Sequence, residues 1–200
     1  EAAAARAPND ARMVLGWGVC ARRGGRGAEA IERLDHAREL LGGKAPGPLW
    51  YWARALAEFV AGTPAQAAPI LEEGIARYPR SAPLRNNLAA LLEQAGDLDR
   101  AEEVAQLALE EDPSLPQASK NLGDLFYRAG RTEEAQTAYA RAVKLAPRLG
   151  DDVYFKLGNI AFKEMRQQDA VEFWREAVSL NPDHSLAKAN LATVERLVGG

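Results

Sequence analysis

The sequence predicts an all-α fold, a solenoid built from antiparallel pairs of helices, and three observations lead to this prediction. Pro79, Pro113, Pro147 and Pro182 follow one another at intervals of 34, 34 and 35 residues. Within each interval, glycine and alanine return at fixed offsets, and larger apolar residues follow the spacing of one helix face. Because one helix pair cannot bury its apolar face alone, the repeated interval indicates that neighbouring pairs stack on each other.

The stretch over residues 117–147 is the most regular of these periods. Its first helix is expected over residues 117–129, because Leu122 and Phe126 fall on one face at helical spacing. Gly130 follows directly, and glycine is the residue best suited to leave a helix through the left-handed backbone region. This half of the period therefore predicts one short amphipathic helix that ends in a tight turn.

The second helix of the same period is expected to begin with Thr132 as its N-cap and to end before Pro147, which cannot donate a helical hydrogen bond. The small Gly123 and Ala135 let the two helices approach closely, and Tyr139 fills the space that remains. The period therefore predicts a helical hairpin whose interior is one aromatic ring between small residues.

These offsets resemble the tetratricopeptide (TPR) repeat. The residues that carry the resemblance are Leu122, Gly123, Phe126, Gly130, Ala135, Tyr139, Ala142 and Pro147. The resemblance covers nearly the whole chain and implies a right-handed TPR superhelix of about five repeats. It specifies the fold and leaves the function open, because packing positions carry no function of their own.

The period divides the chain into repeat units. We expect the tail of a preceding repeat at residues 1–10 and a capping helix or half repeat at residues 185–198. Five whole units are predicted between them, at residues 11–44, 48–81, 82–115, 116–149 and 151–184. The chain begins with Glu rather than Met and has 19 Arg against 6 Lys, from which we expect a fragment of a longer bacterial TPR protein.

The unit at residues 48–81 is the least regular. Arg54 and Glu58 stand where apolar residues are expected, so its first helix is predicted to be rotated or shifted by a residue. Pro69 lies inside the expected second helix and should kink or shorten it. An aromatic stretch that includes Trp52 and Phe59 is either an exposed partner site or part of the buried face, and we favour burial.

Composition excludes several function classes. The net charge of −3 demands neither nucleic acid nor a membrane surface, and the sequence contains no apolar run of 18 residues. The basic segment at residues 22–27 is short and is interpreted as a solvated turn rather than a nucleic-acid-binding patch, with an acidic protein partner as the next option. Two histidines and the single Cys20 have no spaced ligand partners, so no metal or other cofactor is predicted. The compartment stays undetermined, with the cytoplasm slightly favoured.

A partner site is predicted on the exposed face of the first helices. Asn87, Asn121, Lys156 and Asn190 occupy the same slot in consecutive repeats, and an asparagine amide can both donate and accept hydrogen bonds. The row is similar to the asparagine ladder of TPR superhelices that bind extended polypeptide, although Lys156 interrupts it. The alternative is that asparagine is common at this slot and faces water. Further candidates on the same faces are Lys120, Asp124, Tyr127 and Asn159.

The resemblance also raises a second type of site, a clamp of lysines and asparagines for a C-terminal carboxylate. Lys120, Lys156 and Asn159 could contribute to it. The first whole unit has Leu15 and Val19 where the clamp needs a lysine and an asparagine, so this site is disfavoured.

The leading functional hypothesis is a non-catalytic scaffold that binds a partner protein or an extended peptide in its concave groove. Two alternatives remain. The chain is either a structural spacer or assembly segment of a longer repeat protein, with self-association open, or the substrate-recruiting region of an enzyme whose catalytic domain lies elsewhere. No residue pattern in the sequence indicates catalysis.

Overall fold

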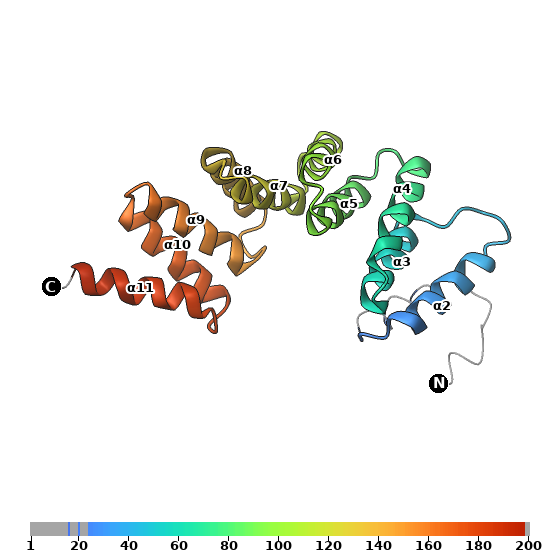
Figure 1. Ribbon diagram of the computed structural model, residues 1–200, viewed down its shortest axis with the longest axis horizontal. Coiled ribbons are helices and arrows are strands. Elements are labelled where there is room, and N and C mark those ends of the chain that lie inside the picture. The colour runs from blue at the N-terminus through green and yellow to red at the C-terminus, as the bar shows by residue number, and fades with distance from the viewer. Residues whose placement is uncertain (1–15, 17–19, 21–23, 199–200) are drawn as a thin grey trace. The chain divides into compact units, whose positions relative to one another are not determined.

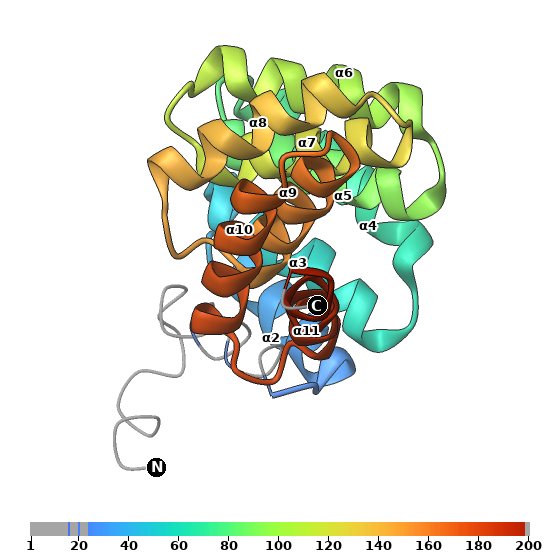
Figure 2. The same cartoon turned by 90° about the vertical axis from the view of Figure 1, so that its left-hand side faces the viewer.

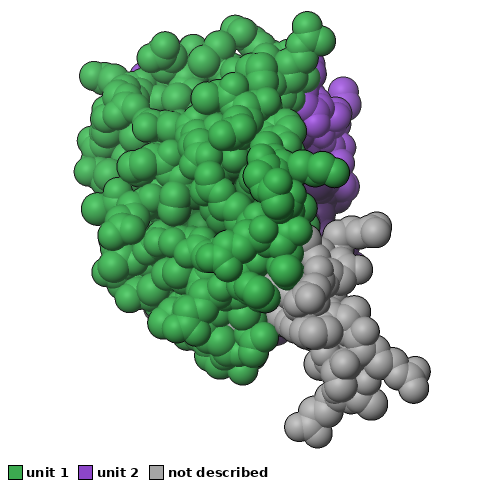
Figure 3. All heavy atoms as spheres, turned by 90° about the vertical axis from the view of Figure 1, so that its right-hand side faces the viewer, with its two compact units in different colours: residues 1–111 green, residues 112–200 purple. Residues whose placement is uncertain are grey.

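A computed structural model describes Gly16, Cys20 and residues 24–198, and this part of the chain is helical throughout, with no strand. The expected repeat tail at residues 1–10 and most of the first helix of the unit at residues 11–44 lie outside the described residues. The chain divides into two compact units, residues 1–111 and residues 112–200 (Figure 3). Each unit is a run of helices packed on their neighbours in sequence (Figure 1).

The first unit contains five described α-helices and one 3₁₀ turn. They are α2 (Gly27–Glu39), α3 (Pro48–Ala61), the turn η1 (Pro64–Gln66), α4 (Ala67–Arg77), α5 (Ala82–Ala95) and α6 (Leu98–Glu111). Each helix packs against the next one along the chain, which is the pattern of successive antiparallel hairpins. The left-handed residues Gly62 and Gly96, with φ of 83° and 85°, end α3 and α5 and allow the chain to turn back.

Helix α3 shares the register of α5 only in its C-terminal half, because its N-terminal half buries Tyr51 and Ala53, whose counterparts Arg85 and Asn87 are half-buried. Its buried Ala55 and Glu58 stand 34 residues before the buried Ala89 and Leu92 of α5. Glu58 remains at a buried position, 3% exposed, because Arg54 on the same helix and the Thr63 hydroxyl both donate hydrogen bonds to its carboxylate. An ion pair therefore replaces the two apolar residues that the pattern requires.

Pro69 shortens the second helix of this hairpin rather than kinking it. Helix α4 begins at Ala67, which leaves Pro69 in the first turn, where a missing backbone N–H costs no helical hydrogen bond. The residues before it form η1, and α4 has 11 residues against 14 in α6. In the aromatic stretch of α3, Trp52 and Phe59 are half-buried.

The second unit contains five helices within its described part. They are α7 (Pro116–Arg128), α8 (Thr132–Leu145), α9 (Asp151–Lys163), α10 (Gln167–Leu180) and α11 (Ser185–Val198). Helix α7 packs on α8, and α10 packs on both α9 and α11 (Figure 2). No helix in the described part of the chain is both long enough and apolar enough to span a bilayer.

Close approach at glycine holds each hairpin of this unit together. A Cβ on Gly123 would lie 2.5 Å from the Tyr139 ring, and a Cβ on Gly158 would lie 2.4 Å from the Trp174 ring. Both rings are buried, and the backbone of the partner helix therefore rests directly on them. This is the arrangement of an aromatic ring between small residues that the sequence predicts.

Two turns of the second unit differ from simple expectation. Thr132 is the first residue of α8 rather than its N-cap, and its hydroxyl donates to the Gly130 carbonyl at 3.3 Å. Met165 has a φ of 63° in the turn after α9, 35 residues after Gly130. In the preceding repeats the left-handed residue of this turn is a glycine, so Met165 occupies a position whose backbone conformation favours glycine.

Candidate functional site

The predicted candidates on α7 and α9 meet at the carboxylate of Asp124. Lys120 Nζ lies 2.8 Å from Asp124 Oδ2, Lys156 Nζ donates to Oδ1, and the Tyr139 hydroxyl donates to the same oxygen at 2.7 Å. Burial alone would raise the pKa of Asp124, but the hydrogen bonds from the two lysines outweigh it and hold that pKa below its ordinary value. Asp124 is therefore a fixed, ionised acceptor, with only 14% of its side chain exposed.

A second carboxylate completes this network. Asp152 Oδ2 lies 2.9 Å from Lys120 Nζ and 3.8 Å from Lys156 Nζ. Burial lowers the pKa of Lys120, yet the hydrogen bonds and charges of Asp124 and Asp152 raise it overall. Two lysines and two aspartates thus form a neutral group, so a carboxylate ligand would have to displace an internal partner. This geometry disfavours the carboxylate clamp.

The same arrangement recurs one repeat later with neutral residues. Asn159, 35 residues after Asp124, accepts a hydrogen bond from Trp174 Nε1 at 3.1 Å and another from Asn190 Nδ2 at 3.2 Å. In each case a side-chain oxygen on the first helix of a repeat accepts two hydrogen bonds. One comes from the aromatic side chain on the second helix of the same repeat, and the other comes from a side chain on the first helix of the next repeat. We call this three-residue arrangement the inter-repeat clasp: Tyr139, Asp124 and Lys156 in one instance, and Trp174, Asn159 and Asn190 in the other.

The predicted slot therefore has an internal role in the second unit. Lys156 and Asn190 each direct a side-chain donor to the preceding repeat, although an ammonium and an amide both keep further N–H groups. Asn121 is half-buried on α7. Asn87, in the first unit, donates from Nδ2 to the Pro83 carbonyl of its own helix at 2.6 Å.

Exposed aromatic side chains lie beyond the clasps on the same helices. Tyr127 on α7 is 37% exposed and Phe162 on α9 is 38% exposed, 35 residues apart in sequence. Their rings contact the buried aromatic residue of their own hairpin, with centroids 6.4 Å apart for Tyr127–Tyr139 and 5.6 Å for Phe162–Trp174. Each exposed ring thus packs against a buried aromatic ring of its own hairpin.

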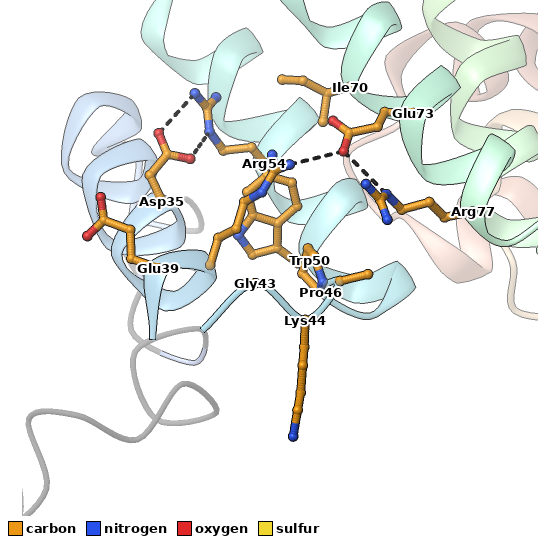
Figure 4. Close-up of a pocket in the computed structure, with 12 residues that line it drawn as sticks. Asp35, Glu39, Gly43, Lys44, Pro46, Trp50, Arg54, Ile70, Glu73 and Arg77 are labelled. Atoms are coloured by element: carbon orange, nitrogen blue, oxygen red, sulfur yellow. Dashed lines mark hydrogen bonds and ion pairs between the residues drawn. The ribbon is translucent and has the colours of Figure 1, made fainter. Parts of the chain in front are cut away.

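A separate cavity of about 600 Å³ lies in the first unit between α2, the connection after it, α3 and α4 (Figure 4). Arg54 in its wall pairs with Asp35 at 2.8 Å, and the indole N–H of Trp50 donates to the Leu34 carbonyl. Glu73 receives two arginines, Arg38 at 3.1 Å and Arg77 at 3.5 Å. Among the described residues, no cluster of His, Cys, Asp and Glu could hold a metal ion.

Two family models match the chain, over residues 59–116 and residues 120–194, and both describe the tetratricopeptide repeat. The chain belongs to the tetratricopeptide repeat family. The family and the all-α solenoid fold predicted from the sequence are thereby confirmed. A solved structure agrees: the TPR protein YrrB, described as having an unusual peptide-binding site, matches with a TM-score of 0.63 at 19% identity and covers 94% of each chain.

Two curated relatives of this TPR chain are much longer than it is. A TPR repeat-containing protein of Pseudomonas aeruginosa is 30% identical over 168 residues, which are 82% of this chain and 28% of the relative. The human protein O-mannosyl-transferase TMTC1 is 29% identical over 137 residues, 67% of this chain and 16% of the relative. The chain therefore spans less than a third of the length of either one.

The structure of the TPR array also shows what the sequence did not reveal. Tyr139 and Trp174 fit the family pattern as packing residues, yet each also donates a hydrogen bond into a clasp. The aromatic residues are 35 positions apart, and so are Asp124 and Asn159, so the sequence already indicated that the two pairs are equivalent in consecutive repeats. The cavity beside Glu73 had no sequence signal, because its charged residues come from three helices and the connection after α2 and form no recognisable motif.

Proposed function

We propose that this chain is a non-catalytic protein-interaction scaffold that binds a partner polypeptide along the exposed face of α7 and α9. The family and the fold support a protein-interaction scaffold, and the surface chemistry supports this face. The observation that carries the proposal is the pair Tyr127 and Phe162, two exposed aromatic rings at equivalent positions, each resting on a buried ring. Rigid aromatic groups of this kind contribute much of the binding energy at protein interfaces.

The clasps prepare this face for binding. Because Asp124 and Asn159 each accept hydrogen bonds from two residues, these polar groups, three residues before Tyr127 and Phe162 on the same helices, are already ordered before a partner arrives. Ordering side chains on binding costs about 0.5–1.5 kcal/mol for each one, so a fixed surface loses less affinity. Asn121, Lys120 and the remaining N–H groups of Lys156 and Asn190 are proposed to contact the partner backbone.

Selection from a phage-displayed library of random 12-residue peptides on the purified chain tests the proposal. Affinity of the selected peptides should fall at least tenfold in Tyr127→Ala with Phe162→Ala, the loss expected for removing two interface aromatics. Leu145→Ala is the matched control, because Leu145 is 42% exposed but lies on the second helix α8. Peptides that bind the double variant as tightly as the wild type would exclude this face.

Asn121 remains a proposed contact from the asparagine row. Replacing Asn121 by Ala should weaken a peptide selected on the wild type, with little change in melting temperature, because the amide contributes a hydrogen bond worth about 0.5–1.5 kcal/mol. An unchanged affinity would remove the asparagine row from the interface and leave the aromatic pair to stand alone.

A second candidate function follows from the relatives. TMTC1 is named as an O-mannosyl-transferase, and the similarity covers 16% of its length. We propose as the alternative that this chain recruits the polypeptide substrate of an enzyme whose catalytic domain lies outside it. Deleting the array from such an enzyme should raise KM for a polypeptide substrate and leave kcat nearly constant. Loss of kcat alone would contradict recruitment.

A further inference from the structure

Four turns in the described part of the chain have the same hydrogen bonds and differ in one residue. In each, the N–H of a left-handed residue donates to the carbonyl three residues earlier, and the next N–H donates to the carbonyl five residues before it. The left-handed residues are Gly62, Gly96, Gly130 and Met165, with φ of 83°, 85°, 74° and 63°. Because three glycines close the same turn, the turn requires the left-handed backbone but not the methionine side chain.

Met165 occupies its turn at an energetic disadvantage. The left-handed region is unfavourable for a residue with a Cβ, and Met165 is the one non-glycine residue with positive φ among the described residues. It is 80% exposed, more than any other large apolar residue in that part of the chain. Folding therefore neither requires nor buries the thioether. A residue held in an unfavourable conformation without a packing role suggests a role in binding.

The neighbours of Met165 place it beside the proposed binding face. Its N–H donates at 3.0 Å to the carbonyl of Phe162, whose ring is the exposed aromatic group of α9. Arg166 follows in the chain and lies 2.6 Å from a carboxylate oxygen of Glu164 and 2.6 Å from one of Asp169. These three charges pair with one another, so Phe162 and Met165 supply the apolar surface at this end of α9.

The two exposed rings of the proposed face do not by themselves fix where a partner binds. Tyr127 and Phe162 occupy equivalent positions, and each contacts a buried ring of its own hairpin. An apolar side chain that fits against one ring therefore also fits against the other. Three residues further on, the first repeat has Gly130 and the second has Met165. A second apolar side chain thus stands near one ring only.

We propose that Met165 is a specificity-determining contact, which fixes the register of the partner polypeptide by binding one of its apolar side chains next to Phe162. The inference rests on the proposed function, because it concerns the same partner on the face of α7 and α9. An unbranched, flexible thioether adapts to apolar side chains of different shape. The partner that fits is an extended segment with two apolar residues over the end of α9 and one over the end of α7.

The test measures the affinity of the full chain for a 12-residue peptide selected on it by phage display. Met165→Gln keeps the Cβ and nearly the same length but removes the apolar character. It should weaken binding about tenfold, the lower end of what burying a methionine side chain contributes. Met165→Leu should retain most of the affinity. Met165→Gly should lose as much affinity as Met165→Gln, although its melting temperature should rise.

A second measurement reads the register directly. A nitroxide label at the N-terminus of the selected peptide broadens the amide NMR signals of residues close to it. On the wild type we expect broadening at the C-terminal end of α7 or of α9, but not of both. On Met165→Gln both sets of signals should broaden, because the peptide then binds in two registers. Leu145→Gln is the matched control, since Leu145 is an exposed apolar residue on α8, and it should behave as the wild type.

The variant Tyr127→Ala with Phe162→Ala separates the failure of this inference from that of the proposed function. Full affinity in that double variant would overturn the proposed function and this inference with it. Lost affinity there with full affinity in Met165→Gln would leave the face in place and overturn the role of Met165.

Two further outcomes would also overturn it. A loss in Met165→Gly without a loss in Met165→Gln would assign the effect to backbone flexibility. Sedimentation of the wild type as a dimer without peptide, and of Met165→Gln as a monomer, would assign the side chain to a second copy of the chain.

Discussion

Replacing Asp124 by Asn should destabilise the second unit, because Asp124 is the one charge among the described residues that lies within 3 Å of both Lys120 and Lys156. Hydrogen bonds to charged groups are worth about 1.5–3 kcal/mol each. The lysines are 23% and 26% exposed and Lys120 keeps Asp152, so the two bonds should together lose about 2 kcal/mol rather than their full sum. For a unit of this size, that loss lowers the melting temperature by about 8–16 °C.

The neighbouring repeat supplies the rescue variant. Asn159 and Asn190 form the neutral version of the same clasp, so Asp124→Asn with Lys156→Asn copies an arrangement that the chain already contains. The double variant should recover at least half of the lost stability, measured by urea unfolding followed by circular dichroism in a double-mutant cycle. A double variant as unstable as the sum of the two single ones would refute this account of the clasp.

The pH dependence of the same comparison has a defined sign. The pKa of Asp124 is depressed in the folded chain, so its stabilising effect is present above the unfolded value of about 3.9 and is lost as the pH falls through the folded value. The stability difference between wild type and Asp124→Asn should therefore be constant near neutral pH and shrink below about pH 4. A difference that persisted at pH 2 would show that the charge is not its source.

Three further predictions concern packing, backbone strain and the buried ion pair. Gly123→Ala should lower the free energy of unfolding by about 1–3 kcal/mol, because the new methyl group meets the fixed Tyr139 ring. A variant as stable as the wild type would contradict the close approach of the two helices. Met165→Gly should raise the melting temperature by a few degrees, because a non-glycine residue in the left-handed backbone region costs about 1–2 kcal/mol. A lower melting temperature would show instead that the methionine side chain stabilises the turn. Glu58→Leu alone should cost about 3 kcal/mol, because it removes the more buried of the two carboxylates that Arg54 contacts. Arg54→Leu with Glu58→Leu should be close to neutral in denaturant unfolding, and equal losses in both variants would exclude this reasoning.

The fold followed from the sequence because small residues and rings recur at a fixed interval. Gly123 and Tyr139 predict a close helix pair from local spacing alone, and the structure places the ring of one against the backbone of the other. Arg54 and Glu58 show the limit of this reasoning. As single letters they suggest a shifted helix, since only the structure reveals that they neutralise each other four residues apart on the buried side.

The site was less predictable than the fold for a related reason. The slot of Lys156 and Asn190 could be found by counting residues, but the direction of its hydrogen bonds depends on what stands in the adjacent repeat, such as Asp124 or Asn159. The interval of 35 residues places Tyr127 and Phe162 on equivalent faces of their helices, but spacing alone does not reveal the buried rings that they contact. The arginines around Glu73 were not predicted, because Arg38 lies on another helix and Arg77 lies one turn away on the same helix, and no residue motif marks either contact.

The two clasps respond differently to dissolved salt. The junction of α7 with α9 is held by ammonium and carboxylate groups, whereas the junction of α9 with α11 is held by amides and an indole. Mobile ions weaken attraction between partly exposed charges and leave neutral hydrogen bonds almost unaffected. Rising ionic strength should therefore weaken the junction of α7 with α9 more than the junction of α9 with α11. The flexibility of the second unit is then set by the solution as well as by the amino-acid sequence.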